Sequence, residues 1–489
     1  MSKKKTGAGE VLSPAPEMEA FLHRILYRVQ LPKKESKALK EDFLRLFAFY
    51  KQAGLSAEEI EERVGDDILG DFYRPPSPDE WYRLDSAAKV YPLSMTHTRG
   101  TMFRVSAYMQ GEVVPVVLQV ALLSVIKRFP VFSTAMKRGV FWHYFDAVRC
   151  RFFVREETQP PCSKIFLGHR QTPCFQVLYY KNRIALEIFH ALTDGTGAMI
   201  FLKTLVREYL RLLGTTAGAE LPDLGEKPLL EEAENAFSQA EKQKKGSGFL
   251  QRMALQPGKG KRKRKNARIL HFIMPTEALC AAAKSENATV TVYLTSHIFS
   301  AVRKTVSYAG GEESMQVQVP INMRRFYPSK SLRNFSLYAV ISLPYKMQDR
   351  EEMVPEIRKQ LEAQTGEEAL ARMLYSANQM ATNPFVRSMP LGLKGLVLKK
   401  IYGILGEKVL SSTLSNLGRV EEDFGKHVRF FDFVLGATCK TNVKCTLVSY
   451  KDTAVLTVTD SMRDKTFPAS IAHALSKAEI PFYIEGVEG

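Results

Sequence analysis

The sequence lacks long hydrophobic runs and paired cysteines. No apolar segment of its 489 residues approaches the about 18–20 residues needed to cross a bilayer. The basic amino terminus, residues 1–5, lacks the apolar stretch of a secretory signal. We therefore expect a cytoplasmic protein without a transmembrane segment. The six cysteines form neither a CxxC pair nor zinc-ligand spacing, which favours reduced, mostly buried thiols over a redox or metal role.

Several catalytic motifs are also missing. The chain has no GxSxG elbow, P-loop, HExxH pair or complete GxGxxG, so nothing supports a hydrolase, an NTPase, a zinc protease or a dinucleotide-binding enzyme. What remains is an ordinary globular composition, with 45% hydrophobic and 25% charged residues. The length allows two or three domains, each with a substantial core.

The net charge of +17 is concentrated in one segment. Residues 241–270 carry eleven Lys or Arg and one Glu, which gives +10 and leaves +7 for the rest. The basic core at 258–265 contains glycines but no aromatic residues to stack on bases, which argues against nucleic acid as a partner. A solvated linker is the first interpretation. Contact with anionic lipid, nucleic acid or a nucleotide phosphate is the weaker one.

Residues 1–74 are predicted to form a small all-α module. Ser56–Glu59 has the pattern of a capping box that opens a third helix, and Pro75–Pro78 breaks regular structure. Two apolar stripes mark the helices before it: Phe21, Leu22, Ile25, Leu26 and Val29, then Leu39, Phe43, Leu46, Phe47 and Tyr50. A docking or oligomerisation role and a purely stabilising role fit this module equally well.

From Trp81 onward, strand-like and helical segments alternate. Residues 115–128 are predicted to be a helix, and 141–153 contain strand-like aromatic stretches. A segment poor in aromatic residues then separates two halves. We expect an N-terminal lobe at 81–240, a basic linker at 241–268 and a C-terminal lobe at 269–489.

One hairpin pattern occurs twice. Residues 174–188 alternate around a Lys-Asn turn, and residues 445–458 repeat the pattern around a Lys-Asp turn, 270 residues later. In this register His190 corresponds to Asp460, so only the first copy carries an imidazole. The repeat indicates two related lobes, the second of which serves architecture and helps to build a cleft.

His190 follows the alternating strand predicted at Arg183–Phe189 and precedes a tight Asp-Gly turn. A helix follows Gly195 and is expected to stop at Gly214. An imidazole held in this way is neutral for much of the time near pH 7 and can take a proton from a hydroxyl. A loop histidine beside an ordinary turn fits the same spacing.

Four motifs occur in the order found in the CoA-dependent acyltransferase superfamily. They are Trp81–Lys89, the HxxxDG motif at His190–Gly195, Val319–Arg325 with Leu332–Phe335, and Leu414–Gly418. The sequence resembles this superfamily across residues 81–489. It includes chloramphenicol acetyltransferase, the plant BAHD acyltransferases, peptide-synthetase condensation domains and the bacterial alcohol acetyltransferases. The resemblance is closest to the last of these.

The resemblance implies an α/β (α+β) fold of two similar lobes with mixed sheets, meeting at an interface channel. It also implies acyl-CoA as co-substrate, no permanently bound cofactor or metal, and a small hydroxyl acceptor, with an amine as the other candidate. His190 would be the general base, without a covalent acyl-enzyme.

The resemblance assigns further residues. Asp194 would orient the histidine loop by pairing with Arg324, and Gly195 and Gly197 would let the backbone turn tightly; ordinary turn glycines would look the same. Donors to the developing oxyanion are expected from Ser415 and Asn416, with Asn334 next. All three could instead satisfy backbone groups at strand ends.

The sequence also departs from parts of the superfamily. Phe189 stands where condensation domains carry a second histidine, which favours a small-acceptor enzyme. Asp423–Gly425 matches the start of the plant DFGWG element, but Lys426 and His427 replace its Trp-Gly, so we interpret the match as coincidental. Two alternatives stay open. One is an ester- or amide-forming enzyme of the same superfamily that uses an acyl-carrier protein. The other is a non-catalytic scaffold or binding protein.

Overall fold

The computed structural model describes residues 16–73, 81–94, 101–163, 172–218, 221–239, 254–258, 263–308, 310, 312–394, 410–437 and 441–487. Its α-helices are α1 Pro16–Leu26, α2 Lys33–Gln52, α3 Ala57–Val64, α4 Tyr91–Ser94, α5 Pro115–Val125, α6 Gly195–Leu212, α7 Thr276–Ser285, α8 Val290–Thr305, α9 Arg350–Thr365, α10 Glu367–Thr382, α11 Pro384–Ser388 and α13 Thr466–Lys477. Its strands are β1 Trp81–Arg83, β2 Met102–Met109, β3 Thr134–Arg138, β4 His143–Ala147, β5 Val154–Glu156, β6 Phe175–Tyr180, β7 Arg183–Phe189, β8 Lys263–Pro275, β9 Ser314–Asn322, β10 Ser336–Pro344, β11 Ser412–Val420, β12 Val428–Leu435, β13 Val443–Tyr450, β14 Thr453–Met462 and β15 Tyr483–Val487.

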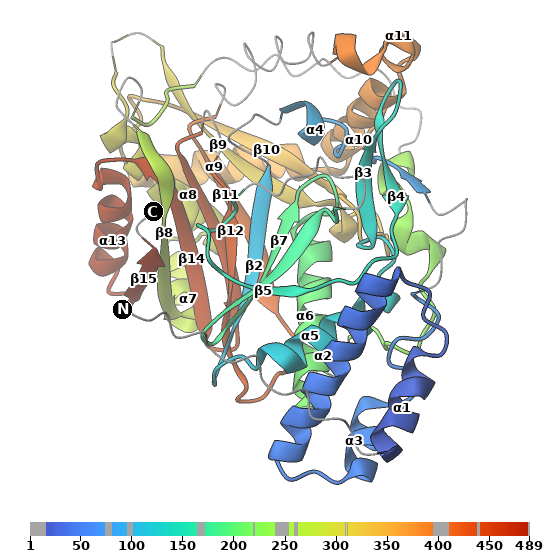
Figure 1. Cartoon of the computed structure of the whole chain (residues 1–489). Coiled ribbons are helices and arrows are strands. Elements are labelled where there is room, and N and C mark those ends of the chain that lie inside the picture. Colours follow the sequence, from blue (N-terminus) through green and yellow to red (C-terminus); the bar gives the residue numbers. More distant parts are fainter. Residues whose placement is uncertain are drawn as a thin grey trace, which may run out of the picture.

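The N-terminal lobe is built on a five-stranded sheet in the order β12-β2-β7-β6-β5. The β5–β6 pair is parallel and the other pairs are antiparallel, so the sheet is mixed. Helices α5 and α6 pack on each other and lie against this sheet (Figure 1). A small three-stranded sheet, β1-β4-β3, stands beside it.

The C-terminal lobe is built on a seven-stranded sheet in the order β10-β9-β11-β13-β14-β8-β15. Strand β11 runs parallel to both of its neighbours, whereas the other pairs are antiparallel. Helix α8 packs against α13, α9 and α7 and covers β9 and β11. The sheets of both lobes are therefore mixed, as predicted.

The sequence-based division between the lobes needs three corrections. Strand β12, from the predicted C-terminal lobe, pairs with β2 and completes the N-terminal sheet. Conversely, Ala236 and Phe237, at the end of the predicted N-terminal lobe, belong to the C-terminal core. Strand β8 begins at Lys263, inside the predicted linker; residues 241–253 and 259–262 of that linker lie outside the described residues. Pairing between distant segments leaves no local pattern, so periodicity alone cannot assign such pieces.

The repeated hairpin is present in both lobes. It is formed by β6–β7 in one and β13–β14 in the other, and Lys181 and Lys451 take the same turn position, each with a φ of 50°. Asp460, at the position equivalent to His190, is buried and lies 3.7 Å from Arg268. The second hairpin therefore holds a buried ion pair where the first presents an imidazole.

The three N-terminal helices share a core with the N-terminal lobe. The Tyr50 hydroxyl donates to the carbonyl of Leu212 at 2.7 Å, and Arg151 pairs with the buried Asp42 at 2.6 Å. The expected capping box is present, because Ser56 and Glu59 each accept from the other's backbone N–H. These contacts fix the helices beside α5 and α6 (Figure 1).

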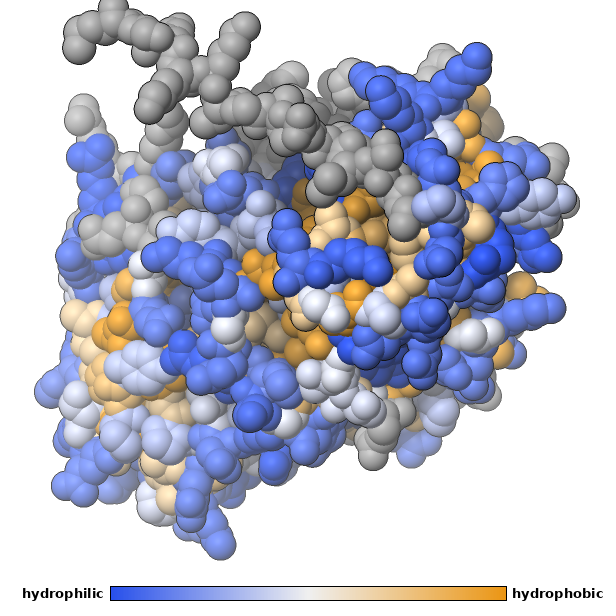
Figure 2. Space-filling view, turned by 60° about the horizontal axis from the view of Figure 1, so that its bottom comes forward, coloured by the Kyte–Doolittle hydropathy of each residue, from blue (hydrophilic) through white to orange (hydrophobic). Residues whose placement is uncertain are grey.

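Within the described ranges, no helix combines the length and the apolar character that a bilayer crossing requires. On the face drawn in Figure 2, hydrophilic side chains surround separate apolar patches. Of the cysteines in the described ranges, Cys150, Cys174 and Cys445 are buried free thiols, whereas the thiol of Cys280 is exposed and that of Cys162 is half-buried.

Candidate active site

The His190 ring lies where the end of β7 meets segments of the C-terminal lobe. Its backbone N–H donates to the carbonyl of Thr101 at 2.9 Å, which fixes the loop after the strand. The imidazole stacks on Tyr91, with ring centroids 4.5 Å apart and planes 16° apart, and contacts Phe103 at 4.8 Å. The residue keeps partial solvent exposure. Two aromatic rings thus hold the imidazole in place.

Asn334 determines which ring nitrogen carries the proton. Its amide nitrogen lies 3.3 Å from a carboxylate oxygen of Asp85 and 3.3 Å from the carbonyl of Ala191. Both partners are acceptors, so the amide oxygen must face His190, where it lies 3.3 Å from Nδ1. Nδ1 therefore donates its proton to Asn334, and the lone pair of Nε2 stays available to accept one.

Burial also favours the neutral imidazole. Desolvation lowers the pKa of His190 below its ordinary value of 6.5, although hydrogen bonding to its own backbone and the charge of Asp194 act in the opposite direction. A neutral imidazole at pH 7 is the form that a general base needs.

Asp194 holds the histidine loop without touching the imidazole. It caps helix α6 by accepting from the N–H of Gly197 at 3.2 Å. Its other carboxylate oxygen accepts from Arg324 at 2.8 Å, from the N–H of Phe335 at 2.8 Å and from the hydroxyl of Ser336 at 3.1 Å. Burial opposes ionisation, yet the Arg324 charge and these hydrogen bonds hold the pKa of Asp194 below its usual value. This carboxylate is a structural anchor.

Arg324 connects Asp194 to the segment that carries Asn334. Its guanidinium donates to the carbonyl of Ser331 at 3.0 and 2.8 Å, and to the carbonyl of Arg333 at 2.5 Å. One ion pair between Asp194 and Arg324 therefore positions both the loop of His190 and the residue that orients its ring.

Asp85 belongs to this arrangement, although sequence reasoning gave it no role. It is fully buried, accepts from the N–H of Ala88 at 2.7 Å and lies 3.6 Å from the guanidinium of Arg333. Desolvation raises the pKa of Asp85, and the charge of Arg333 opposes this rise. The first motif contained Asp85 in sequence, but only the fold brings it to Asn334 and hence to His190.

The Asn334 contact leads to a prediction. If the His190 ring acts as a base, Asn334→Ala should lower kcat by about 10²-fold, because the ring would lose near-attack geometry, while KM changes little. Steady-state kinetics on a variant with an unchanged unfolding midpoint will check this. An unaltered kcat would contradict the orienting role.

Gly195 and Gly197 are required by close packing. Neither is among the glycines with positive φ, so the expected tight turn is not the reason for them. A Cβ on Gly197 would lie 2.3 Å from the backbone carbonyl oxygen of Leu332, and one on Gly195 would lie 2.5 Å from a methyl group of Leu417. The helix start thus sits directly against the C-terminal lobe.

Gly197→Ala should destabilise the protein by about 1–3 kcal/mol, the usual cost of overpacking, because backbone atoms cannot move aside. Gly195→Ala should cost less, since a side-chain methyl can rotate away. Chemical denaturation will measure both, with Gly111→Ala as the control because a Cβ there meets nothing within 4 Å. Equal stability of the Gly197 and Gly111 variants would be inconsistent with this packing.

The three oxyanion candidates lie in different situations. Asn416 donates to the hydroxyl of Thr291 at 3.2 Å and accepts from the N–H of Gly418 at 2.8 Å, so it stabilises the irregularity in β11. The Asn334 amide is engaged as described above. Ser415 is buried and lies opposite Thr446 of β13, whose hydroxyl donates to the carbonyl of Phe433 in β12 of the other sheet. Ser415 is therefore the candidate that faces the other lobe.

The residues at which the sequence departs from the superfamily pattern have structural roles. Phe189 is fully buried in the N-terminal core, so no second histidine position opens on the site. Asp423 pairs with Lys451 at 2.8 Å on the surface, and the N–H of Gly425 donates to it. Residues Asp423–Gly425 therefore stabilise the turn of the second hairpin through Lys451. They make no contact with His190.

Room for a ligand lies next to this network. A cavity of about 950 Å³ is lined by Lys89 and Arg333, among others, whereas His190 is not one of its lining residues. The channel expected at His190 itself stays a prediction. No cluster of three or more His, Cys, Asp or Glu side chains that could hold a metal ion occurs in the described part of the chain.

No protein-family model matches the sequence, and no curated protein matches it. Solved structures do match. TRI101 from F. sporotrichioides, complexed with coenzyme A and T-2, is 14% identical, covers 83% of this chain and 100% of its own, and has a TM-score of 0.56. The first condensation domain of the calcium-dependent antibiotic synthetase is 11% identical, with the same coverage and a TM-score of 0.54. TRI3 trichothecene 15-O-acetyltransferase from Fusarium sporotrichioides is 13% identical, covers 83% of this chain and 95% of its own, and has a TM-score of 0.50. The chain therefore has the two-lobed fold that these proteins share.

Proposed function

We propose that this protein transfers an acyl group from acyl-CoA to a hydroxyl group, with His190 as the general base. The orientation of the imidazole carries the proposal: Nδ1 faces the Asn334 oxygen, and Nε2 is left as the basic atom. The fold supports it, because proteins of this fold include one complexed with coenzyme A and one that is an O-acetyltransferase.

The reaction needs one proton carrier. Nε2 of His190 takes the proton from the acceptor hydroxyl while the oxygen attacks the thioester carbonyl carbon. The tetrahedral intermediate collapses when the carbon–sulfur bond breaks. The departing thiolate takes the proton from Nε2, which yields an ester and free CoA thiol. The base is thereby restored without an acyl-enzyme.

The negative charge on the intermediate needs a hydrogen-bond donor. We assign this role to the Ser415 hydroxyl, since the side chains of Asn334 and Asn416 have other partners. Asp194 and Arg324 then serve as positioning residues that fix the two loops, and Asp85 fixes Asn334.

Release of free thiol tests the proposal. Purified full-length protein should release CoA thiol from acetyl-CoA or a longer acyl-CoA only when an alcohol from a panel is present, and mass spectrometry should detect the ester. If only an acyl-loaded carrier protein supports product formation, or only amines accept, the condensation-type alternative is correct. If neither donor reacts with any acceptor, the scaffold alternative gains support and the proposal fails.

A further inference from the structure

The cavity beside the active-site network has a chemical character of its own. Besides apolar surface, four cationic side chains and one carboxylate of the described residues line it. The carboxylate is Asp146, which already lies 3.8 Å from Lys137. The positive charge of Arg333 is compensated by the carboxylate of the buried Asp85, which lies 3.6 Å away. The charge that remains inside the cavity is therefore positive.

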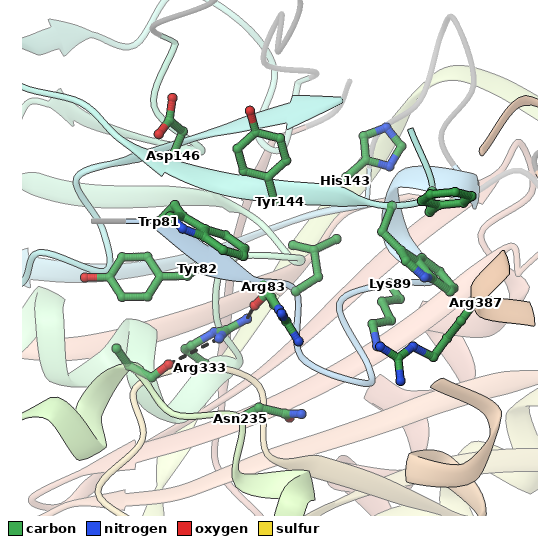
Figure 3. A pocket seen from close by; sticks show the side chains of 14 residues that line it. Trp81, Tyr82, Arg83, Lys89, His143, Tyr144, Asp146, Asn235, Arg333 and Arg387 are labelled. Atoms are coloured by element: carbon green, nitrogen blue, oxygen red, sulfur yellow. Dashed lines mark hydrogen bonds between the residues drawn. The ribbon is translucent and has the colours of Figure 1, made fainter. Parts of the chain in front are cut away.

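The arginines supply most of this charge. Arg83 and Arg387 are both exposed, and neither guanidinium has a hydrogen bond or ion pair within the described parts of the chain. Figure 3 shows Lys89 next to Arg387 on one side of the cavity, with Trp81 and Tyr82 on the other. Burial lowers the pKa of Lys89; the charge of Asp85 opposes this, and the positive charges of Arg387, Arg83 and Arg333 add to it. The positive charges of these arginines act on Lys89 as repulsion, which a bound anion would relieve.

Aromatic rings form the walls of the same cavity. The Arg83 guanidinium lies 5.7 Å from the Trp81 ring, and Trp142 is flanked by Lys89 at 5.1 Å and Lys394 at 3.6 Å. Such rings offer a flat apolar surface, and they lower the dielectric around the cations. The volume of about 950 Å³ suits a ligand of drug size.

One further polar atom lacks a partner there. The amide oxygen of Asn235, at the edge of this cavity, is buried and has no hydrogen bond within the described residues. Buried polar atoms without partners are uncommon in folded proteins, and an ordered water commonly satisfies them. This oxygen is closed to solvent, so the cations and the aromatic rings, instead of Asn235, are what indicate a ligand.

We propose that this cavity is a binding site for an organic anion, a carboxylate or a phosphate with a flat apolar body. Arg83, Lys89 and Arg387 would bind the anionic group, and Trp81 and Trp142 would pack on the apolar part. Two sources share this chemistry: the nucleotide end of the acyl donor and an acidic acceptor. Binding itself does not depend on the proposed acyl transfer; only the choice between donor and acceptor rests on it.

Binding in this cavity can be followed by the fluorescence of the protein's own tryptophans. It has two tryptophans, Trp81 and Trp142, and both line the cavity. Intrinsic tryptophan fluorescence therefore reports on this cavity alone. Titration of the full-length protein with phenyl phosphate and phenylacetate should produce a saturable change. The uncharged phenylacetamide should bind at least about tenfold more weakly, the difference expected when a charge-assisted hydrogen bond is lost.

Variants make the test specific. Arg387→Ala should weaken phenyl phosphate binding by about tenfold, whereas Arg387→Lys should retain part of it. Arg372→Ala, an exposed arginine on α10 with a loose 3.9 Å contact to Glu368, is the matched control and should bind like the unaltered protein. His190→Ala should also bind normally, so loss of catalysis and loss of this site can be told apart.

A competition experiment distinguishes the two possible sources of the anion. If adenosine 3′,5′-bisphosphate displaces phenyl phosphate, the cavity accepts the nucleotide end of the donor; if it does not, that source is excluded and the acidic acceptor is the remaining one. Equal binding of phenylacetate and phenylacetamide, or no saturable change with either anion, would overturn the proposal.

Discussion

His190→Gln should lower kcat/KM by about 10²–10⁴-fold, the range that general-base assistance contributes. Glutamine keeps a comparable volume between Tyr91 and Phe103 and retains an N–H for Asn334, but it has no basic nitrogen. His190→Ala should lose at least as much activity. The measurement is thiol release at saturating acyl-CoA, together with the unfolding midpoint of each variant.

The control is His473→Ala, which removes an exposed histidine from α13 and should leave turnover unchanged. A His190→Gln enzyme with activity within a few-fold of the unaltered protein would remove His190 from the mechanism. An inactive variant that is also unfolded would be replaced by His190→Ala before any conclusion is drawn.

The second large effect concerns stability. Asp194→Ala should lower the free energy of unfolding by about 3–5 kcal/mol, because it leaves the Arg324 guanidinium largely buried and without its carboxylate. It also removes the cap of α6 and the acceptor for Phe335 and Ser336. Activity should fall in parallel, since the same contacts hold the loops of His190 and Asn334. Urea denaturation followed by circular dichroism measures the stability change.

Asp423→Ala is the matched control for this prediction. Asp423 also pairs with a cation at 2.8 Å, but its side chain is 75% exposed and the pair is screened by water, so its loss should change the stability far less than the loss of Asp194. If the Asp194 and Asp423 variants lost the same stability, the buried ion pair would not be the anchor proposed here. Loss of activity in Asp194→Ala without loss of stability would instead indicate a direct catalytic role.

Local patterns in the sequence predicted the local structure well. Strand β7 has the predicted bounds, helix α6 follows it and ends before Gly214, and the capping box at Ser56 is formed. The two hairpins were visible because alternation and turn residues repeat. Each of these features depends on residues that are close in the chain.

Features that depend on distant residues were not predictable in the same way. Strand β12 joins β2 across more than 300 residues, and its pattern fits either lobe. Asn334 was expected to donate to an oxyanion, yet its amide lies between Asp85, Ala191 and His190. The cationic cavity combines β1, β4 and α11, which no motif connects. Only the three-dimensional arrangement reveals such groupings.

The acid limb of the pH profile of kcat/KM is the direct test of His190 as the general base. Since desolvation lowers the pKa of His190 below 6.5, its neutral form persists at pH 7. The rate constant should be level there and fall only as the pH drops through that lowered pKa. An inflection below 6.5 that disappears in His190→Gln is the predicted result. An inflection above 6.5, or one that persists unchanged in that variant, would contradict the assignment of the base.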